Sequence, residues 1–158
     1  MTVSLVETNP IDFVDFEPLH QLLSTSFAYM EGRIDPPSSL TRLSVSGLRQ
    51  KSRTEDLFVV RNAGGPIACL FGAARPDAYY IGKLAVAAPQ RGRGHARALV
   101  EAAATRAGAL GLSALELQSR IELVENHAAF GAMGFVQTAA TAHEGYDRPT
   151  SLTFRRAL

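Results

Sequence analysis

The sequence predicts one α/β (α+β) domain, in which about four helices flank a mixed, mostly antiparallel sheet of about seven strands. Three observations support this fold class. Apolar residues recur at helical spacing in some segments and at strand spacing in others. These segments follow one another in the order strand, helices, three strands, helix, strand, helix, two strands. The 158 residues contain no repeat, low-complexity tract or linker that would divide the chain.

The composition is typical of a globular protein, with 46% apolar and 20% charged residues. A formal charge of +1 argues against a generally basic surface, so we expect no nucleic-acid partner and only a local anion site. The single cysteine, Cys69, lies in an apolar run and is expected to be a buried small residue rather than a nucleophile.

The N-terminal region carries Glu7 and Asp12 where a signal peptide needs a basic and then an apolar segment. No run approaches the ~18 apolar residues of a membrane span. We therefore expect a soluble cytoplasmic protein without membrane contact. The four histidines show no metal-ligand spacing, so no metal is expected; they are His20, His95, His127 and His143.

The first third of the chain predicts a strand, a helix, a loop and a second helix. The strand is Val3 to Val6, and the helix begins near Phe16, with Pro18 in its first turn. Residues 31–39 contain glycine and prolines and predict an ordered loop. Ser44 or Ser46 caps a short polar helix that runs through Arg53. The apolar face of the first helix consists of Phe16, Leu19, Leu23, Phe27 and Met30.

The middle third predicts an antiparallel hairpin, another strand and an amphipathic helix. The hairpin pairs residues 57–60 with 67–73 across a turn at 62–65, and the next strand spans Tyr79 to Val86. Gly108 and Gly111 help to end the helix that follows. Its apolar side consists of Leu99, Val100, Ala103, Ala107 and Leu110.

The final third of the chain predicts a strand, a short helix and then two more strands. A strand at Ala114 to Gln118 leads to a helix at about Val124 to Met133. Strands near Phe135 to Ala139 and Ser151 to Phe154 complete the sheet.

The loop from Arg91 to Ala96 joins the strand that ends at Val86 to a helix, and it contains Gly92 and Gly94. Helix N-terminal amides lack partners within the helix, so such a loop is suited to a phosphate. The spacing matches neither the Rossmann fingerprint nor a Walker loop. Two alternatives remain: glycines needed only for the turn, and a contact to RNA through the Arg-Gly pairs.

Arg91-x-x-Gly94-x-Ala96 resembles the acetyl-CoA motif of the GCN5-related N-acetyltransferase (GNAT) family. Ile81 to Val86 is similar to the fourth strand of that family, and Asn126 to Phe135 to its helix ending in a Gly-Phe pair. The resemblance covers roughly residues 3 to 156. It implies a single N-acetyltransferase domain over residues 1–158, in which strands four and five splay apart around acetyl-CoA.

The resemblance also implies which residues bind coenzyme A. Backbone groups of the fourth strand pair with pantetheine, the glycine loop holds the phosphates, and the second helix packs against the cofactor. These residues are Leu84, Ala85, Val86, Arg91, Gly92, Arg93, Gly94, His95, Ala96, Asn126 and Phe130. For His95, donation to phosphate and an exposed place at the helix start are both open.

The proton-transfer groups do not follow the family, because Phe130 stands where many members have the tyrosine that protonates the thiolate. Tyr146 is the tyrosine we would test in that role. Glu116 is the candidate base, since strand alternation puts it with Gln118 on the face opposite Leu115 and Leu117. An ungapped count back from Phe130 instead sets Gln118 at the position where some relatives carry a glutamate.

The acceptor is expected to be a primary amine of a small molecule or peptide. The family places its first helix and the following loop over the amine side, which points to Tyr29 and Arg33 here. Arg33 and Lys83 could hold a carboxylate, and Glu31 and Asp35 an ammonium. The sequence leaves a homodimer open. The rival interpretation is a CoA-binding module of the same fold without efficient catalysis.

Overall fold

The computed structural model describes residues 5–158. Within this range one seven-stranded sheet has the order β1-β2-β3-β4-β5-β7-β6. The strands are β1 (Glu7–Thr8), β2 (Asp56–Asn62), β3 (Gly65–Ala74), β4 (Tyr79–Val86), β5 (Ala114–Arg120), β6 (Val136–Thr141) and β7 (Ser151–Ala157). The helices are α1 (Phe16–Phe27), α2 (Val45–Thr54), α3 (His95–Ala109) and α4 (Val124–Ala132), with 3₁₀ turns η1 (Ala28–Met30), η2 (Ser39–Arg42) and η3 (Ala88–Gln90).

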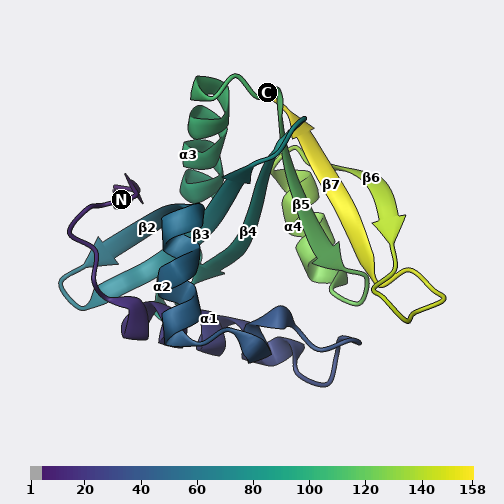
Figure 1. Ribbon diagram of the computed structural model, residues 1–158, viewed down its shortest axis with the longest axis horizontal. Coiled ribbons are helices and arrows are strands. Elements are labelled where there is room, and N and C mark those ends of the chain that lie inside the picture. Colours follow the sequence, from purple (N-terminus) through teal and green to yellow (C-terminus); the bar gives the residue numbers. More distant parts are fainter. Residues whose placement is uncertain (1–4) are drawn as a thin grey trace.

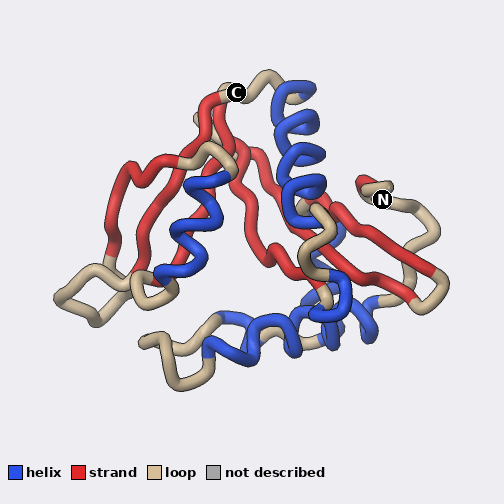
Figure 2. Tube along the Cα trace, turned by 180° about the vertical axis from the view of Figure 1, so that it is seen from behind, coloured by secondary structure: helices blue, strands red, loops and turns tan. Residues whose placement is uncertain are grey.

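The sheet has two arms that meet between β4 and β5. These strands are parallel, whereas every other pair of neighbours in the described sheet is antiparallel. Only Tyr79 with Leu115 and Tyr80 with Glu116 are in register, and beyond them the strands diverge. Both views show the arms separating away from the end where the C-terminus lies (Figures 1 and 2). The predicted fold class is confirmed.

Helices cover both faces of the β1–β4 arm, because alternate residues of its strands point to opposite sides. On one face Val59, Cys69 and Phe71 pack with the buried residues of α1 and α2. On the other, Phe58, Leu70 and their neighbours pack with α3, and the partly buried Phe130 of α4 joins this second cluster. None of the helices in the described chain is long and apolar enough to cross a membrane.

Within the described residues the first strand, Glu7–Thr8, lies later in the chain than the predicted Val3 to Val6. Residues 1–4 are outside the described range, and Leu5 and Val6 are not in a strand. Instead Glu7 pairs with Val59 of β2, and its carboxylate binds Arg61 at 2.6 Å. This ion pair and the backbone pairing fix the strand at Glu7–Thr8, whereas Leu5 is exposed.

Helix ends account for the other departures from the predicted elements. Helix α1 ends at Phe27 and tightens into η1, so Met30 is not part of its α-helical face. In α3, Gly108 lies inside the helix, and the chain leaves it at Gly111, where φ is +78°. Leu110 is therefore the C-cap rather than a buried residue and is 42% exposed.

Candidate functional site

The larger cavity, of about 1130 Å³, lies where β4 and β5 diverge. Its lining comes from both arms of the sheet, from α4, from the β6–β7 loop and from the segment that joins α1 to α2. In Figure 1 that segment passes across the open end between the arms. One cavity is therefore lined both by the diverging strands and by the segment between α1 and α2.

The β4 wall of the cavity includes Leu84, Ala85 and Val86, as the sequence predicts for a cofactor strand. Ala85 and Val86 pair with β3 on one side. On the β5 side, no strand of residues 5–158 pairs with β4 beyond Tyr80. Backbone N–H and C=O groups on that side are consequently open to a ligand that can hydrogen-bond to them.

The glycine loop forms a turn with two left-handed residues, Gly92 at φ +79° and Gly94 at φ +86°. Gly94 is the N-cap of α3 and directs its first backbone amides out of the helix. Arg91 and Ala96 line the cavity, and Arg91 Nε donates to the carbonyl oxygen of Val86 at 3.2 Å. The loop thus has the conformation of an anion-binding helix start.

The place of His95 excludes one of the two alternatives that the sequence left open for it, an exposed residue at the start of the helix. Its side chain is only 4% exposed, so it is not a solvated residue at the helix start. Its buried Nδ1 has no hydrogen-bond partner within the described chain. Gly92, Arg93, Gly94 and His95 do not line the cavity, so their predicted role rests on the loop backbone rather than on side chains in the cavity.

The α4 wall contributes Asn126 and Phe130. The ring of Phe130 packs near those of Phe135 and Phe154, with centroid distances of 6.1 and 6.2 Å. Asn126 Nδ2 donates to the hydroxyl of Tyr29 at 2.9 Å. The position of Phe130 fits the predicted packing role, and Asn126 connects α4 to the segment above the opening.

Glu116 does not line the cavity, so the structure does not support its predicted role as a base at the acceptor cleft. Its carboxylate accepts from Arg155 Nε at 3.0 Å on the neighbouring strand. Gln118, two residues further along β5, does line the cavity. Alternation correctly placed Glu116 and Gln118 on the same face of β5. However, β5 still pairs with β4 at Glu116, and the two strands diverge only beyond that residue.

Tyr146 lies in the cavity wall, in the loop between β6 and β7. Its hydroxyl donates to Asp35 at 2.6 Å, and this hydrogen bond raises the pKa of Tyr146. The phenol keeps its proton at neutral pH, which a general acid requires. Arg148 also binds Asp35, at 3.3 Å.

Of the three predicted acceptor residues, Tyr29 and Lys83 line the cavity and Arg33 does not. Arg33 binds Glu125 at 2.9 Å and the carbonyl oxygen of Glu122, so its predicted role with an acceptor carboxylate is not supported by its place. Lys83 has φ +55° at an irregularity in the β3–β4 register. Burial is the main cause that lowers the pKa of Lys83.

Sequence reasoning missed Arg120 and His143, which both line the cavity. Burial and the charge of Arg120 lower the pKa of His143, so its imidazole is neutral at pH 7. Its backbone N–H donates to Thr150 Oγ1 at 2.8 Å. No local pattern marks these residues, because the β6–β7 loop meets the end of β5 only in the folded chain.

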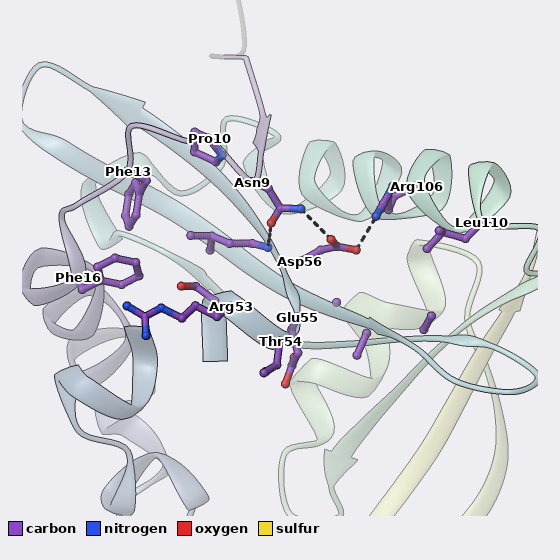
Figure 3. A pocket seen from close by; sticks show the side chains of 15 residues that line it. Asn9, Pro10, Phe13, Phe16, Arg53, Thr54, Glu55, Asp56, Arg106 and Leu110 are labelled. Atoms are coloured by element: carbon purple, nitrogen blue, oxygen red, sulfur yellow. Dashed lines mark hydrogen bonds and ion pairs between the residues drawn. The ribbon is translucent and has the colours of Figure 1, made fainter. Parts of the chain in front are cut away.

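A second cavity, of about 540 Å³, lies near the start of β2 (Figure 3). Asp56 at its edge accepts hydrogen bonds from Asn9 at 2.7 Å, Arg106 at 3.1 Å and Tyr79 at 2.5 Å. These groups satisfy one another, so we assign them a structural role. Among residues 5–158 no group of three histidine, cysteine or acidic side chains could hold a metal ion.

Comparison with protein-family models identifies one family. The model of the acetyltransferase (GNAT) family matches residues 16–135. A structure of a GCN5-related N-acetyltransferase from Rhodopseudomonas palustris is similar with a TM-score of 0.74 at 15% identity, covering 100% of this chain and 98% of that one. The search of curated proteins finds no match.

Two further solved structures share the fold over nearly their whole length. An IAA acetyltransferase from Bacillus cereus gives a TM-score of 0.66 at 18% identity, covering 98% of this chain and 99% of that one. A GNAT family acetyltransferase from Elizabethkingia anophelis, solved with acetyl-CoA bound, gives 0.66 at 13% identity, covering 98% and 97%. At these identities the likeness establishes the fold.

Proposed function

The chain belongs to the acetyltransferase (GNAT) family, and we propose that it transfers the acetyl group of acetyl-CoA to a primary amine as one N-acetyltransferase domain over residues 1–158. The observation that carries the proposal is the divergence of β4 from β5 beside the N-terminus of α3. It leaves an open strand edge next to an anion-binding turn within one cavity. A pantetheine chain attached to phosphates requires that combination.

In this proposal the donor half of the site consists of residues that the sequence predicts for it. Leu84 to Val86 offer backbone groups to the amides of pantetheine, and Arg91 with the first amides of α3 binds the phosphates. Phe130 covers the cofactor from α4. These groups orient the thioester toward the acceptor side of the cavity, and orientation supplies much of the rate enhancement.

The acetyl transfer forms a C–N bond and breaks the C–S bond of the thioester. The attacking amine loses one proton, and the departing thiolate gains one. We assign the first proton to His143, whose lowered pKa keeps it neutral and able to accept. Tyr146, whose raised pKa keeps it protonated, is the donor to the thiolate. No step in this scheme requires Glu116 or a metal ion.

The proposal is tested by measuring thiol release from acetyl-CoA with a panel of primary amines. We expect acceptor-dependent turnover, and His143→Gln is expected to lower kcat by about 10²-fold with CoA affinity unchanged, since general base catalysis has that magnitude. Tight CoA binding without turnover on any amine would instead support the rival interpretation of a CoA-binding module. Salt-sensitive RNA binding that CoA fails to displace would support the RNA alternative.

A further inference from the structure

Two cations enter the larger cavity from opposite arms of the sheet. Lys83 belongs to β4, and Arg120 is the last residue of β5. Lys83 Nζ donates to Ser39 Oγ at 3.0 Å. Arg120 donates to the carbonyl oxygens of Pro36 and Pro37, at 2.5 and 3.1 Å. Both side chains are therefore held under the same short segment between α1 and α2.

Neither cation has a carboxylate within 4.0 Å in the described chain, since neither takes part in an ion pair. The direct partners of both cations are hydroxyl and carbonyl oxygens, and the more distant carboxylates, Glu55 for Lys83 and Glu122 and Asp35 for Arg120, offset the effect of burial only in part. Burial, then Lys51 and Arg120, lower the pKa of Lys83, and burial lowers that of Arg120. An anion between them would relieve this unfavourable arrangement.

The cavity as a whole has an excess of basic side chains. Its lining contains six lysines and arginines and three glutamates, so that basic groups outnumber acidic ones twofold. Two of the glutamates are already neutralised, Glu55 by Lys51 at 2.8 Å and Glu125 by Arg33 at 2.9 Å. Glu144 is the third and is exposed in the β6–β7 loop. The lining is thus suited to a negatively charged ligand.

The two cations lie on a different side of the β1–β4 arm from the turn that is proposed to bind the phosphates. Lys83 and Arg120 contact residues 36–39, between α1 and α2. Helix α1 and helix α3 pack in different core clusters, on opposite faces of the β1–β4 arm. An anion at Lys83 and Arg120 consequently approaches from the acceptor side, not from the side of α3.

We propose that Lys83 and Arg120 together bind a carboxylate of the acceptor, so that the natural acceptors are amino-acid-like amines rather than amines without an acid group. The planar guanidinium of Arg120 can bind both oxygens of a carboxylate, and the ammonium of Lys83 adds a second charge. This inference rests on the proposed function. Arg120 takes the place that the sequence suggested for Arg33.

The test compares the common L-amino acids with their carboxamides as acceptors in the thiol-release assay. The wild-type protein is expected to favour the acids by roughly 10- to 100-fold in kcat/KM, because a carboxamide cannot form the charged hydrogen bonds that a carboxylate forms with Lys83 and Arg120. Lys83→Met and Arg120→Gln are expected to remove most of this preference by raising KM for the acids alone. Lys83→Arg is expected to retain it.

The matched control is the double variant Lys51→Met with Glu55→Gln, which removes a neutral ion pair from the same cavity and keeps its net charge. Its preference for acids is expected to stay within about twofold of the wild type, since no net charge changes. CoA affinity and melting temperature show whether each variant is folded. Equal use of acids and amides by the wild type, or weaker CoA binding by folded Lys83→Met, would overturn the proposal.

A binding measurement separates this proposal from the proposed function. Calorimetry with N-acetyl amino acids and their amides, in the presence of CoA, detects the carboxylate preference without turnover. If no amine is acetylated but the acids still bind through Lys83 and Arg120, the anion site stands and the transferase proposal fails. If amines are acetylated while N-acetyl acids bind no better than amides, the anion site fails alone.

Discussion

Gly94 has φ +86°, a conformation that side chains with a Cβ rarely adopt. Gly94→Glu also introduces a negative charge at the amides that the phosphates would use. We expect the variant to lose at least about 10²-fold in CoA affinity, as two charges of the same sign meet there at close range. Isothermal calorimetry with CoA measures the loss.

Gly111 offers a matched control for that substitution. It has φ +78° and lies beyond the opposite end of α3, and a Cβ added to it would meet no other atom within 4 Å. Gly111→Glu carries the same backbone strain and charge away from the cavity. Comparable loss of CoA affinity in both variants would show that the effect comes from strain and would remove the phosphate assignment.

Single residues also show where sequence reasoning reaches its limit. Leu84 to Val86 line the cavity as expected, because their role depends on the backbone of a strand that the sequence identifies. Glu116 was misplaced, because its availability depends on where two strands separate. Arg33 was misplaced for a similar reason, since its partner Glu125 lies 92 residues away along the chain.

Helix α2 illustrates a choice that is made at the level of the element. The sequence allowed Ser44 or Ser46 as its cap, and the structure selects Ser44, whose Oγ accepts from the backbone N–H of Gly47 at 3.0 Å. Ser44→Ala is expected to lower the free energy of unfolding by about 1 kcal/mol. Ser46→Ala, within the first turn, is expected to have a much smaller effect. Urea titration of both variants measures the two free energies of unfolding. Equal destabilisation by the two serine variants would contradict the assigned cap.

A second element, β4, shows how local pattern and tertiary structure combine. Its bounds, Tyr79–Val86, are those predicted from the sequence. The positive φ at Lys83 and the register shift beside it were not predicted, because they arise from pairing with β3. That irregularity lies at the lysine assigned to the acceptor carboxylate.

At the scale of the whole molecule, Asp56 joins three parts of the fold. It accepts from Asn9 of the N-terminal segment, Tyr79 of β4 and Arg106 of α3, as the contacts in Figure 3 show in part. Burial opposes its charge, but the hydrogen bonds from Tyr79, Asn9 and Arg106 outweigh burial and lower its pKa below 3.8. Its ionised form therefore stabilises the folded state.

A lowered pKa gives stability that is present above the unfolded pKa and lost as pH falls through the folded value. Asp56→Asn is expected to lower the free energy of unfolding by roughly 1 to 3 kcal/mol at pH 7. The difference from wild type should shrink below pH 3.8. Urea unfolding at pH 7 and pH 3 measures it.

Asp77→Asn is the control for this pH effect. Asp77 also has a lowered pKa, because of Arg155, but its side chain is 73% exposed. Solvent screens such a pair, so we expect little change in stability at either pH. A constant deficit of Asp56→Asn between pH 7 and pH 3 would show that shape rather than charge accounts for its effect.

The sequence by itself determined the order of the elements and the fold class, and it predicted the donor half of the site that we propose. These features are local, since periodicity, capping residues and a glycine turn before a helix act over a few neighbouring residues. Tertiary structure alone decided which side chains meet in the cavity. Arg120 contacts Pro36 across 84 residues of chain, and Tyr146 contacts Asp35 across 111. Such contacts follow from the divergence of β4 and β5, and no short segment encodes that geometry.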